Sequence, residues 1–441
     1  MARSNSTIMA SVPESRNLLF GRAQYVSAAT VCICFLVAAC GKKPVSRPPE
    51  SRPSDAHVEV PTVVASLPGS SLSFVRQMGA RLDALPANAG LEARMEAASI
   101  AREVGDLWRR ESLLRLILKQ QPDDQRVQFL LAETLERLMR LREAKSLYLK
   151  LLAANPKRVE PYLGLASTAM ELDGRAAAWK WLEQGVKACS DDIRSLLQLA
   201  GRYREWDDLP AASSLLSRAL KREPTNSSLS FQRATVLLQM GKTKEGRDGL
   251  ENLLLRESVH AGAHVALATS ILSEAESISD LEAARAHAER AATLNAANPD
   301  AHWVSAAIYR RLGLLRLAAR SYVQSLALNP ADPQSRFGLA QVYGELGMAD
   351  LASRQMAIYK DAAARIRSRK LDVARTSKDG SRPNMHLELA REAERIGNYA
   401  VAVREAQTAV GLGASDSEAR RYLALLYSRL DWGRPPAGPR G

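Results

Sequence analysis

A proline recurs in this chain at a fixed interval. Pro122 and Pro156 lie 34 residues apart (156 − 122), and Pro224 follows Pro156 at twice that distance. Proline cannot donate a backbone hydrogen bond and disfavours helical geometry in the residue before it, so each of these positions is expected to end a helix. Stops at a constant interval predict that the chain between them is built from one repeated unit.

Residues 123–156 show what that unit contains. Apolar residues lie at helical spacing in two groups, separated by the short polar segment Arg140–Arg142. Side chains three and four positions apart share one face of a helix, so each group predicts an amphipathic helix. The first group is Phe129, Leu131, Leu135 and Leu138, and the second is Ala144, Leu147, Tyr148, Leu151 and Leu152.

The residues within the unit resemble the tetratricopeptide repeat, a helix–turn–helix motif of 34 residues. Within 125–158 its small positions hold Ala132 and Ala144, its large positions hold Leu131 and Tyr148, and its terminal proline is Pro156. Matching residues recur in 193–226, 299–332 and 333–366. The resemblance implies an all-α fold, a right-handed superhelical solenoid.

The register divides the chain into segments. We expect the solenoid to occupy 71–366, with a short capping helix and repeats beginning at 91, 125, 159, 193, 227, 261, 299 and 333. The sixth repeat carries about four extra residues, expected in its internal turn near Glu274–Asp280. A basic linker at 367–382 precedes a C-terminal repeat and capping helix at 383–432, and 433–441 reads as a disordered tail.

The N-terminal segment resembles a bacterial lipoprotein signal peptide. The apolar run Tyr25–Ala39 is too short for a comfortable membrane span, and it ends in small residues before Cys40 and Gly41. The resemblance implies that residues 1–39 are removed and that Cys40 carries a lipid. An ordinary secretory peptide and an uncleaved anchor are the alternatives. Residues 40–70 are rich in proline and read as a disordered stalk. The expected location is the cell envelope, at the periplasmic face of the outer membrane.

Composition agrees with a helical array and limits the partners. Hydrophobic residues make up 46% of the 441 residues but aromatic residues only 5%, which suits close helix–helix packing. The formal net charge is +13. The basic residues are scattered among acids, and an exported lipoprotein does not ordinarily meet nucleic acid, so we expect no nucleic-acid partner. The four cysteines show no pairing pattern.

No segment carries a catalytic, metal or cofactor signature. Gly241-Lys242 would need a glycine at position 236 to form a phosphate-binding loop, and that position holds Val236. His260 and His264 have the spacing of a metal pair but no third ligand. Cys189 is interpreted as a small buried residue rather than a reactive thiol. The chain is therefore not expected to be an enzyme or to bind a cofactor.

Two acidic pairs have a structural interpretation. Asp191-Asp192 and Asp207-Asp208 fall near predicted helix starts, where a carboxylate accepts backbone hydrogen bonds and complements the helix dipole. We expect helix caps at these positions rather than groups for acid–base catalysis.

The candidate binding residues share one register position. In this repeat family the fifth residue of each unit points into the concave groove, and here that residue is apolar throughout. Apolar side chains at this position also pack between repeats, and the sequence does not decide between the two roles. Nor does position five hold the lysine or asparagine that a clamp for C-terminal carboxylates requires. The proposed groove residues are Phe129, Leu163, Leu197, Phe231, Val265, Trp303, Phe337 and Leu387.

The function expected from these features is a membrane-anchored scaffold. Its partner would be a protein or peptide segment held in the groove, in envelope assembly or export. If the groove interpretation holds, removing Trp303 and Phe337 should release the partner and leave stability nearly intact. One alternative is an envelope glycan- or polymer-binding protein, with Arg310, Arg311, Arg391 and Arg395 as anion contacts. Another is an accessory subunit of an envelope enzyme complex.

Overall fold

A computed structural model describes residues 59, 72–330, 332–360, 382–395, 397–412 and 417–433. Every regular element in these residues is an α-helix, and no strand occurs among them, which confirms the all-α fold. The signal peptide with Cys40, the stalk, the basic linker and the tail lie outside the described residues, apart from Glu59, Arg382 and Gly433 at single positions.

The helices follow one another in pairs. A single helix, α2 (Leu72–Asp83), precedes the first pair, and the odd-numbered helices α3 to α17 begin at the residues where the sequence placed the starts of repeats one to eight. The pairs are α3 (Leu91–Glu103) with α4 (Leu107–Gln120), α5 (Gln125–Arg137) with α6 (Leu141–Ala154), α7 (Val159–Leu172) with α8 (Arg175–Ala188), α9 (Ile193–Glu205) with α10 (Leu209–Arg222), α11 (Ser227–Gln239) with α12 (Thr243–Arg256), α13 (Ala261–Glu274) with α14 (Ile278–Leu294), α15 (Pro299–Arg311) with α16 (Leu315–Leu328), and α17 (Pro333–Glu345) with helical residues 349–360. The C-terminal helices are α19 (Arg382–Arg395), α20 (Tyr399–Gly411) and α21 (Ser417–Arg429).

A side-chain cap lies at the N-terminus of the first helix in most repeats. The Asp124 carboxylate accepts a hydrogen bond from the Val127 backbone N–H at 3.0 Å, which satisfies a donor that the helix leaves without an internal partner. The same kind of cap recurs at Asp192, Asn226, Asn298 and Asp332. These caps explain why the helix starts keep the 34-residue register.

The turn inside most of the repeats contains one residue with left-handed backbone geometry. Gly105 and Gly313 hold this position with φ of 79° in the first and seventh repeats. Met139 and Asp207 hold it in the second and fourth with φ of 60° and 62°, although a side chain disfavours that region. The turn therefore keeps its geometry even where glycine is absent.

Small and large residues alternate in the packing between helices. Ala132 and Ala144, which the register places where α5 and α6 cross, are both fully buried in one core cluster. Tyr148 is also buried, and its ring lies directly against Gly164 of the next repeat, where an added Cβ would be 2.3 Å from Tyr148 Cζ. The alanines thus bring two helices of a repeat together, and the tyrosine fills the space to the following repeat.

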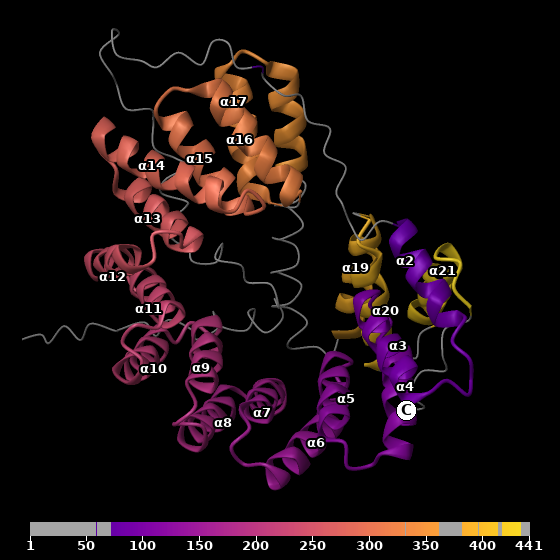
Figure 1. The fold of residues 1–441 in the computed structure, drawn as a ribbon. Helices are drawn as coiled ribbons and strands as arrows, with labels where there is room; N and C mark the ends of the chain where they lie inside the picture. Colours follow the sequence, from indigo (N-terminus) through magenta and orange to yellow (C-terminus); the bar gives the residue numbers. More distant parts are fainter. Residues whose placement is uncertain are drawn as a thin grey trace, which may run out of the picture.

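The curvature of the array comes from unequal packing on its two sides. Successive odd-numbered helices contact one another in the pairs α5–α7, α7–α9, α11–α13, α13–α15 and α15–α17, whereas successive even-numbered helices from α4 to α16 make no comparable contacts. Figure 1 shows α7, α9, α11 and α13 toward the inside of an arc and α8, α12 and α14 toward its outside. We call the surface formed by α5, α7, α9, α11, α13, α15 and α17 the inner face.

The sixth repeat accommodates its extra residues differently from the prediction. Its internal turn is short, running from Ala275 to Ser277, and α14 is lengthened to 17 residues. Ser277 and Asp280 form a reciprocal capping box at the start of α14. This cap fixes the start of α14. Most of the inserted residues therefore belong to the helix rather than to the loop.

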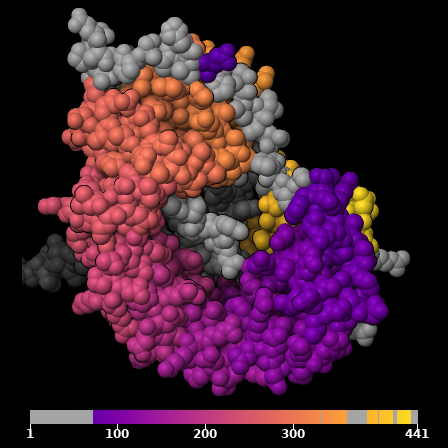
Figure 2. All heavy atoms as spheres, viewed as in Figure 1, coloured from indigo at the N-terminus to yellow at the C-terminus, as the bar shows by residue number. Residues whose placement is uncertain are grey.

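The C-terminal helices return to the beginning of the array. Figures 1 and 2 show α19–α21 beside α2–α4, at the opposite end of the arc from α13 and α14. One core cluster joins buried residues of α2–α6 with those of α19–α21, among them Leu135, Ala406 and Tyr427. The C-terminal helices therefore share one core with the first helices of the array.

Candidate interaction surface

The eight proposed groove residues do not form one uniform surface. Five of them are half-buried, namely Phe129, Leu163, Leu197, Phe231 and Phe337. Val265 and Trp303 are each 4% exposed, and Leu387 is 5% exposed. Leu387 lies on α19, within the core shared with the N-terminal helices, so the structure separates it from the inner face.

The aromatic groove residues contact neighbouring side chains as well as the inner face. The Phe129 ring lies 6.1 Å from the Tyr148 ring between centroids, and the Arg158 guanidinium lies 5.4 Å from its centroid. Phe231 packs against His260 at 4.8 Å. Phe337 packs in the same way against Tyr359, at 5.0 Å. These contacts fix the rings but leave part of each accessible.

Trp303 belongs to the core of the repeats around it. It is buried in the cluster that contains Ala268, Ile308 and Tyr322, and its indole N–H has no hydrogen-bond partner among the described residues. Its burial favours the packing role over the groove role at this position, because this side chain fills space between helices.

The first repeats carry a partly buried charge cluster near the C-terminal end of α5. Glu133 accepts hydrogen bonds from Arg110 Nη2 at 3.0 Å and from Arg137 Nη2 at 3.1 Å. Burial acts to raise the pKa of Glu133, but the two guanidinium groups outweigh it and hold that pKa below its ordinary value. Glu133 is thus a charged group held in place by two arginines from α4 and α5.

The pKa of Glu136, one turn further along α5, is shifted in the opposite direction. Burial raises the pKa of this carboxyl group, although the Tyr148 hydroxyl donates a hydrogen bond to Oε2 at 2.8 Å. Two carboxyl groups three residues apart on α5 therefore differ in their affinity for a proton. Both instead hold neighbouring side chains of the first two repeats through hydrogen bonds.

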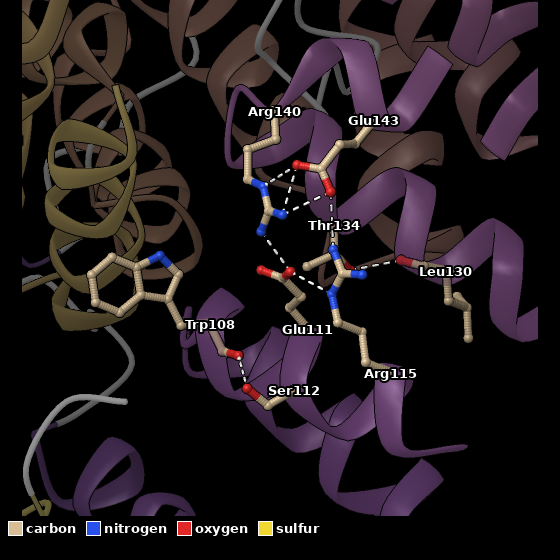
Figure 3. Close-up of polar contacts among 8 residues, drawn as sticks. All are labelled: Trp108, Glu111, Ser112, Arg115, Leu130, Thr134, Arg140 and Glu143. Carbon is tan, nitrogen blue, oxygen red and sulfur yellow. Dashed lines mark hydrogen bonds and ion pairs between the residues drawn. The ribbon is translucent and has the colours of Figure 1, made fainter. Parts of the chain in front are cut away.

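A second ionic network joins the first two repeats (Figure 3). Glu111 Oε1 accepts hydrogen bonds from Arg115 Nε at 2.7 Å and from Arg140 Nη1 at 2.5 Å. Glu143 binds the same two arginines, and it receives a hydrogen bond from Arg140 Nε at 2.6 Å. Because Glu111 and Arg115 lie on α4 whereas Arg140 and Glu143 lie at the start of α6, this network fixes the angle between the repeats.

The four arginines considered for a glycan or polymer are engaged within the protein. Arg310 bonds to Gln341 and Glu345, and Arg311 donates to the carbonyls of Leu272 and Ala275. On the C-terminal helices, Arg391 pairs with Glu388 and Glu418, and Arg395 pairs with Glu392. None of the four therefore presents an isolated cation to an anionic polymer.

Two of the histidines, His264 and His287, form a pair that their spacing in the sequence did not indicate. His264 Nδ1 lies 2.9 Å from His287 Nδ1, and His264 Nε2 lies 3.1 Å from the Ser258 carbonyl. His260 instead caps α13, accepting a hydrogen bond from the Ala263 N–H. Burial, followed by the neighbouring His264, lowers the pKa of His287. The described residues contain no group of three or more potential ligands that could hold a metal ion.

The remaining candidate residues have structural roles. Cys189 is 3% exposed, its thiol donates to the Lys157 carbonyl at 3.2 Å, and burial raises the pKa of the thiol. Asp192 and Asp208 cap α9 and α10, as the sequence indicated. Within the described part of the chain, no helix has both the length and the apolar character needed to cross a bilayer.

The contact between the C-terminal helices and the beginning of the array is the feature that the sequence did not indicate. We call it the seam: the contact of α19–α21 and Trp432 with α2, the α3–α4 turn and the α5–α6 turn. At its centre the Gln407 side chain is fully buried. Gln407 Oε1 accepts hydrogen bonds from the backbone N–H of Leu107 at 2.8 Å and of Trp108 at 3.3 Å, and its Nε2 donates to Asp106 Oδ1 at 2.7 Å.

Close backbone contacts complete the seam. A Cβ on Gly105 would lie 1.8 Å from the Ala400 carbonyl oxygen, so only glycine fits there. The Trp432 indole N–H donates to the Val75 carbonyl at 3.3 Å. Arg76 Nε forms an exposed ion pair with Asp431 at 3.0 Å. The sequence carries a weak signal for this site: the polar residue Gln407 lies at a buried position of α20.

Helix pairs that repeat every 34 residues outside the longer sixth repeat, with small residues between paired helices and a curved inner face, define the tetratricopeptide-repeat architecture, and this chain has it. Proteins of this class are typically non-enzymatic scaffolds for protein–protein interaction. No protein-family model and no curated protein matches the chain.

Solved structures to which the chain is similar include repeat proteins. A thermophilic TPR protein of Thermus thermophilus has 25% identity and a TM-score of 0.35, over 40% of this chain and 97% of that chain. A tetratricopeptide repeat protein from Parabacteroides merdae has 15% identity and a TM-score of 0.42, over 57% and 98%. PilF of Pseudomonas aeruginosa has 17% identity and a TM-score of 0.37, over 48% and 95%.

Proposed function

We propose that this protein is a membrane-anchored, periplasmic scaffold for cell-envelope assembly or export, and that the inner face binds a segment of a partner protein. The observation that carries the proposal is the row of half-buried apolar residues along successive inner helices, above all Leu163, Leu197 and Phe231. Each belongs to a different repeat at one register position, so an extended segment lying across the repeats would meet them in turn.

Photo-crosslinking tests the binding surface directly. A photoreactive amino acid at position 163 or 197 should give crosslinked partner species, because these side chains are half-buried on α7 and α9. The matched control is position 255 on α12, where Leu255 is 83% exposed and lies on an outer helix. Crosslinks of equal yield at position 255, or none at the two inner positions, would contradict the proposal.

The anchor is tested separately. The motif ending in Cys40 and Gly41 supports lipid attachment at Cys40, so Cys40→Ser should abolish acyl labelling and lipoprotein-type processing. The variant should also leave the membrane fraction. Acyl labelling that persists in Cys40→Ser would exclude the lipoprotein assignment without affecting the binding proposal.

A further inference from the structure

One arginine of the inner face is half-buried and has no ion-pair partner among the described residues. Arg204 lies in the last turn of α9, two helical turns after Leu197, so both side chains lie on the same side of that helix. The guanidinium group of Arg204 makes no hydrogen bond or ion pair with any residue that the structure describes. Its neighbour Glu205 forms an ion pair with Arg202 instead, at 3.1 Å.

This lack of a partner is costly for a group that is partly removed from water. Other buried arginines are satisfied: Arg110 pairs with Glu133, and Arg336 donates to the Pro330 carbonyl. Burial lowers the pKa of Arg204, and only the adjacent carboxylate, which is already paired, opposes that shift. A cation at the end of a helix complements the helix dipole, but this interaction leaves the N–H donors of the guanidinium group unsatisfied. A desolvated charge without a partner lowers stability.

Space for a ligand lies beside this cation. Gly201 precedes Arg204 by one helical turn, so the two residues are neighbours on the surface of α9. A Cβ on Gly201 would have no heavy atom of another element within 4 Å. One side of α9 therefore presents an apolar side chain at Leu197, an open surface at Gly201 and a cation at Arg204.

We propose that Arg204 binds the side-chain carboxylate of an aspartate or glutamate in the partner segment. The segment then carries an apolar residue that contacts Leu197 and an acidic residue that pairs with Arg204. Side-chain carboxylates are the anions that a protein segment supplies along its length, and a guanidinium group can bind a carboxylate through two parallel N–H groups. The inference rests on the proposed function, because it names the chemistry of the segment that the inner face binds.

Unfolding of the protein without any partner gives the first test. Arg204→Met removes the charge and keeps a long unbranched side chain, so the midpoint of thermal unfolding should rise by about 2 °C or more. The measurement uses the full-length chain in detergent. Arg218→Met is the matched control, because Arg218 is exposed on α10, the second helix of the same repeat, and its loss should leave the midpoint unchanged. An unchanged or lower midpoint for Arg204→Met would mean that Arg204 is not a costly unpaired charge, and it would overturn the proposal.

Selection of peptides gives the second test. Random peptides are displayed on phage without a free C-terminus and are selected against the full-length chain in detergent. The peptides that bind should be enriched in aspartate or glutamate, and replacing that acid by its amide should weaken binding by about tenfold or more. This loss should disappear in Arg204→Met and persist in Arg218→Met.

The outcomes separate this inference from the proposed function. Peptides that bind more weakly to Leu197→Ala but contain no acid, or whose acid contributes equally in Arg204→Met, would overturn the role of Arg204 and leave the inner face as the binding surface. Binding that requires a free C-terminal carboxylate would also overturn it. Peptides whose binding is unaffected by both Leu163→Ala and Leu197→Ala would contradict the proposed function itself.

Discussion

At the scale of single residues, position five of the repeat shows that one register position serves two roles. Leu163 and Leu197 are half-buried on the inner face, whereas Val265 and Trp303 are buried in the core. All four look alike in the sequence, because each is an apolar residue with the same place in the motif. How deeply the side chain at position five is buried depends on how closely the neighbouring repeats approach. The residue type at that position does not determine this distance.

The first prediction concerns this difference. Trp303→Ala should lower the free energy of unfolding by about 3–5 kcal/mol, the usual cost of removing a buried aromatic side chain. Phe337→Ala, at the same register position but half-buried, should cost clearly less. Denaturant unfolding of the two variants checks both values. Equal losses would mean that the assigned burial of these residues is wrong.

The second prediction concerns pH. Burial lowers the pKa of His287 below the ordinary histidine value of about 6.5, so the unfolded chain takes up a proton at a higher pH than the folded chain. The contribution of this histidine to stability is therefore present above about pH 6.5 and is lost as the pH falls below it.

His287→Gln should flatten the loss of stability between about pH 6.5 and pH 5, as measured by urea unfolding at several pH values. His302→Gln serves as the control, because His302 Nε2 contacts the Ala296 carbonyl rather than another histidine. A pH dependence that is unchanged in His287→Gln would exclude the histidine pair as its source.

At the scale of helices, much of the structure was predictable from sequence. The capping residues and the repeat period together predict where the first helix of a repeat begins. Thus α5 begins at Gln125 and α9 begins at Ile193, where the register placed them. The sixth repeat was less predictable. Counting residues reveals an insertion but not its conformation, and the capping box of Ser277 with Asp280 made most of it helical.

The third prediction tests the packing between paired helices. Ala144 is fully buried where α6 crosses α5, so Ala144→Phe should destabilise the protein by about 1–3 kcal/mol through overpacking. Ala153→Phe on the same helix is the control, because Ala153 is exposed. Thermal or denaturant unfolding gives the comparison. A stability change near zero for Ala144→Phe would show that the register is misplaced.

At the scale of the whole molecule, the period predicted the solenoid but not the packing of α19–α21 against the N-terminal helices. A repeat motif describes contacts between neighbours in sequence, and the seam joins residues such as Leu107 and Gln407 that are far apart. Gln407 reads as an ordinary polar residue in the amphipathic helix α20, and Gly105 as an ordinary turn glycine. Their role depends on the C-terminal helices packing against the N-terminal helices, and no local sequence pattern predicts that contact.

Crosslinking between engineered cysteines tests this contact most directly. Arg76 and Asp431 form an ion pair across the seam and are both exposed, so Arg76→Cys with Asp431→Cys should crosslink within one chain through a short bifunctional maleimide. Leu255→Cys with Asp431→Cys, which pairs the seam with the outer side of the fifth repeat, should not. A high yield of intrachain product for the first pair alone is the predicted result. The absence of that product would mean that α19–α21 do not pack against the N-terminal helices, and it would contradict the seam.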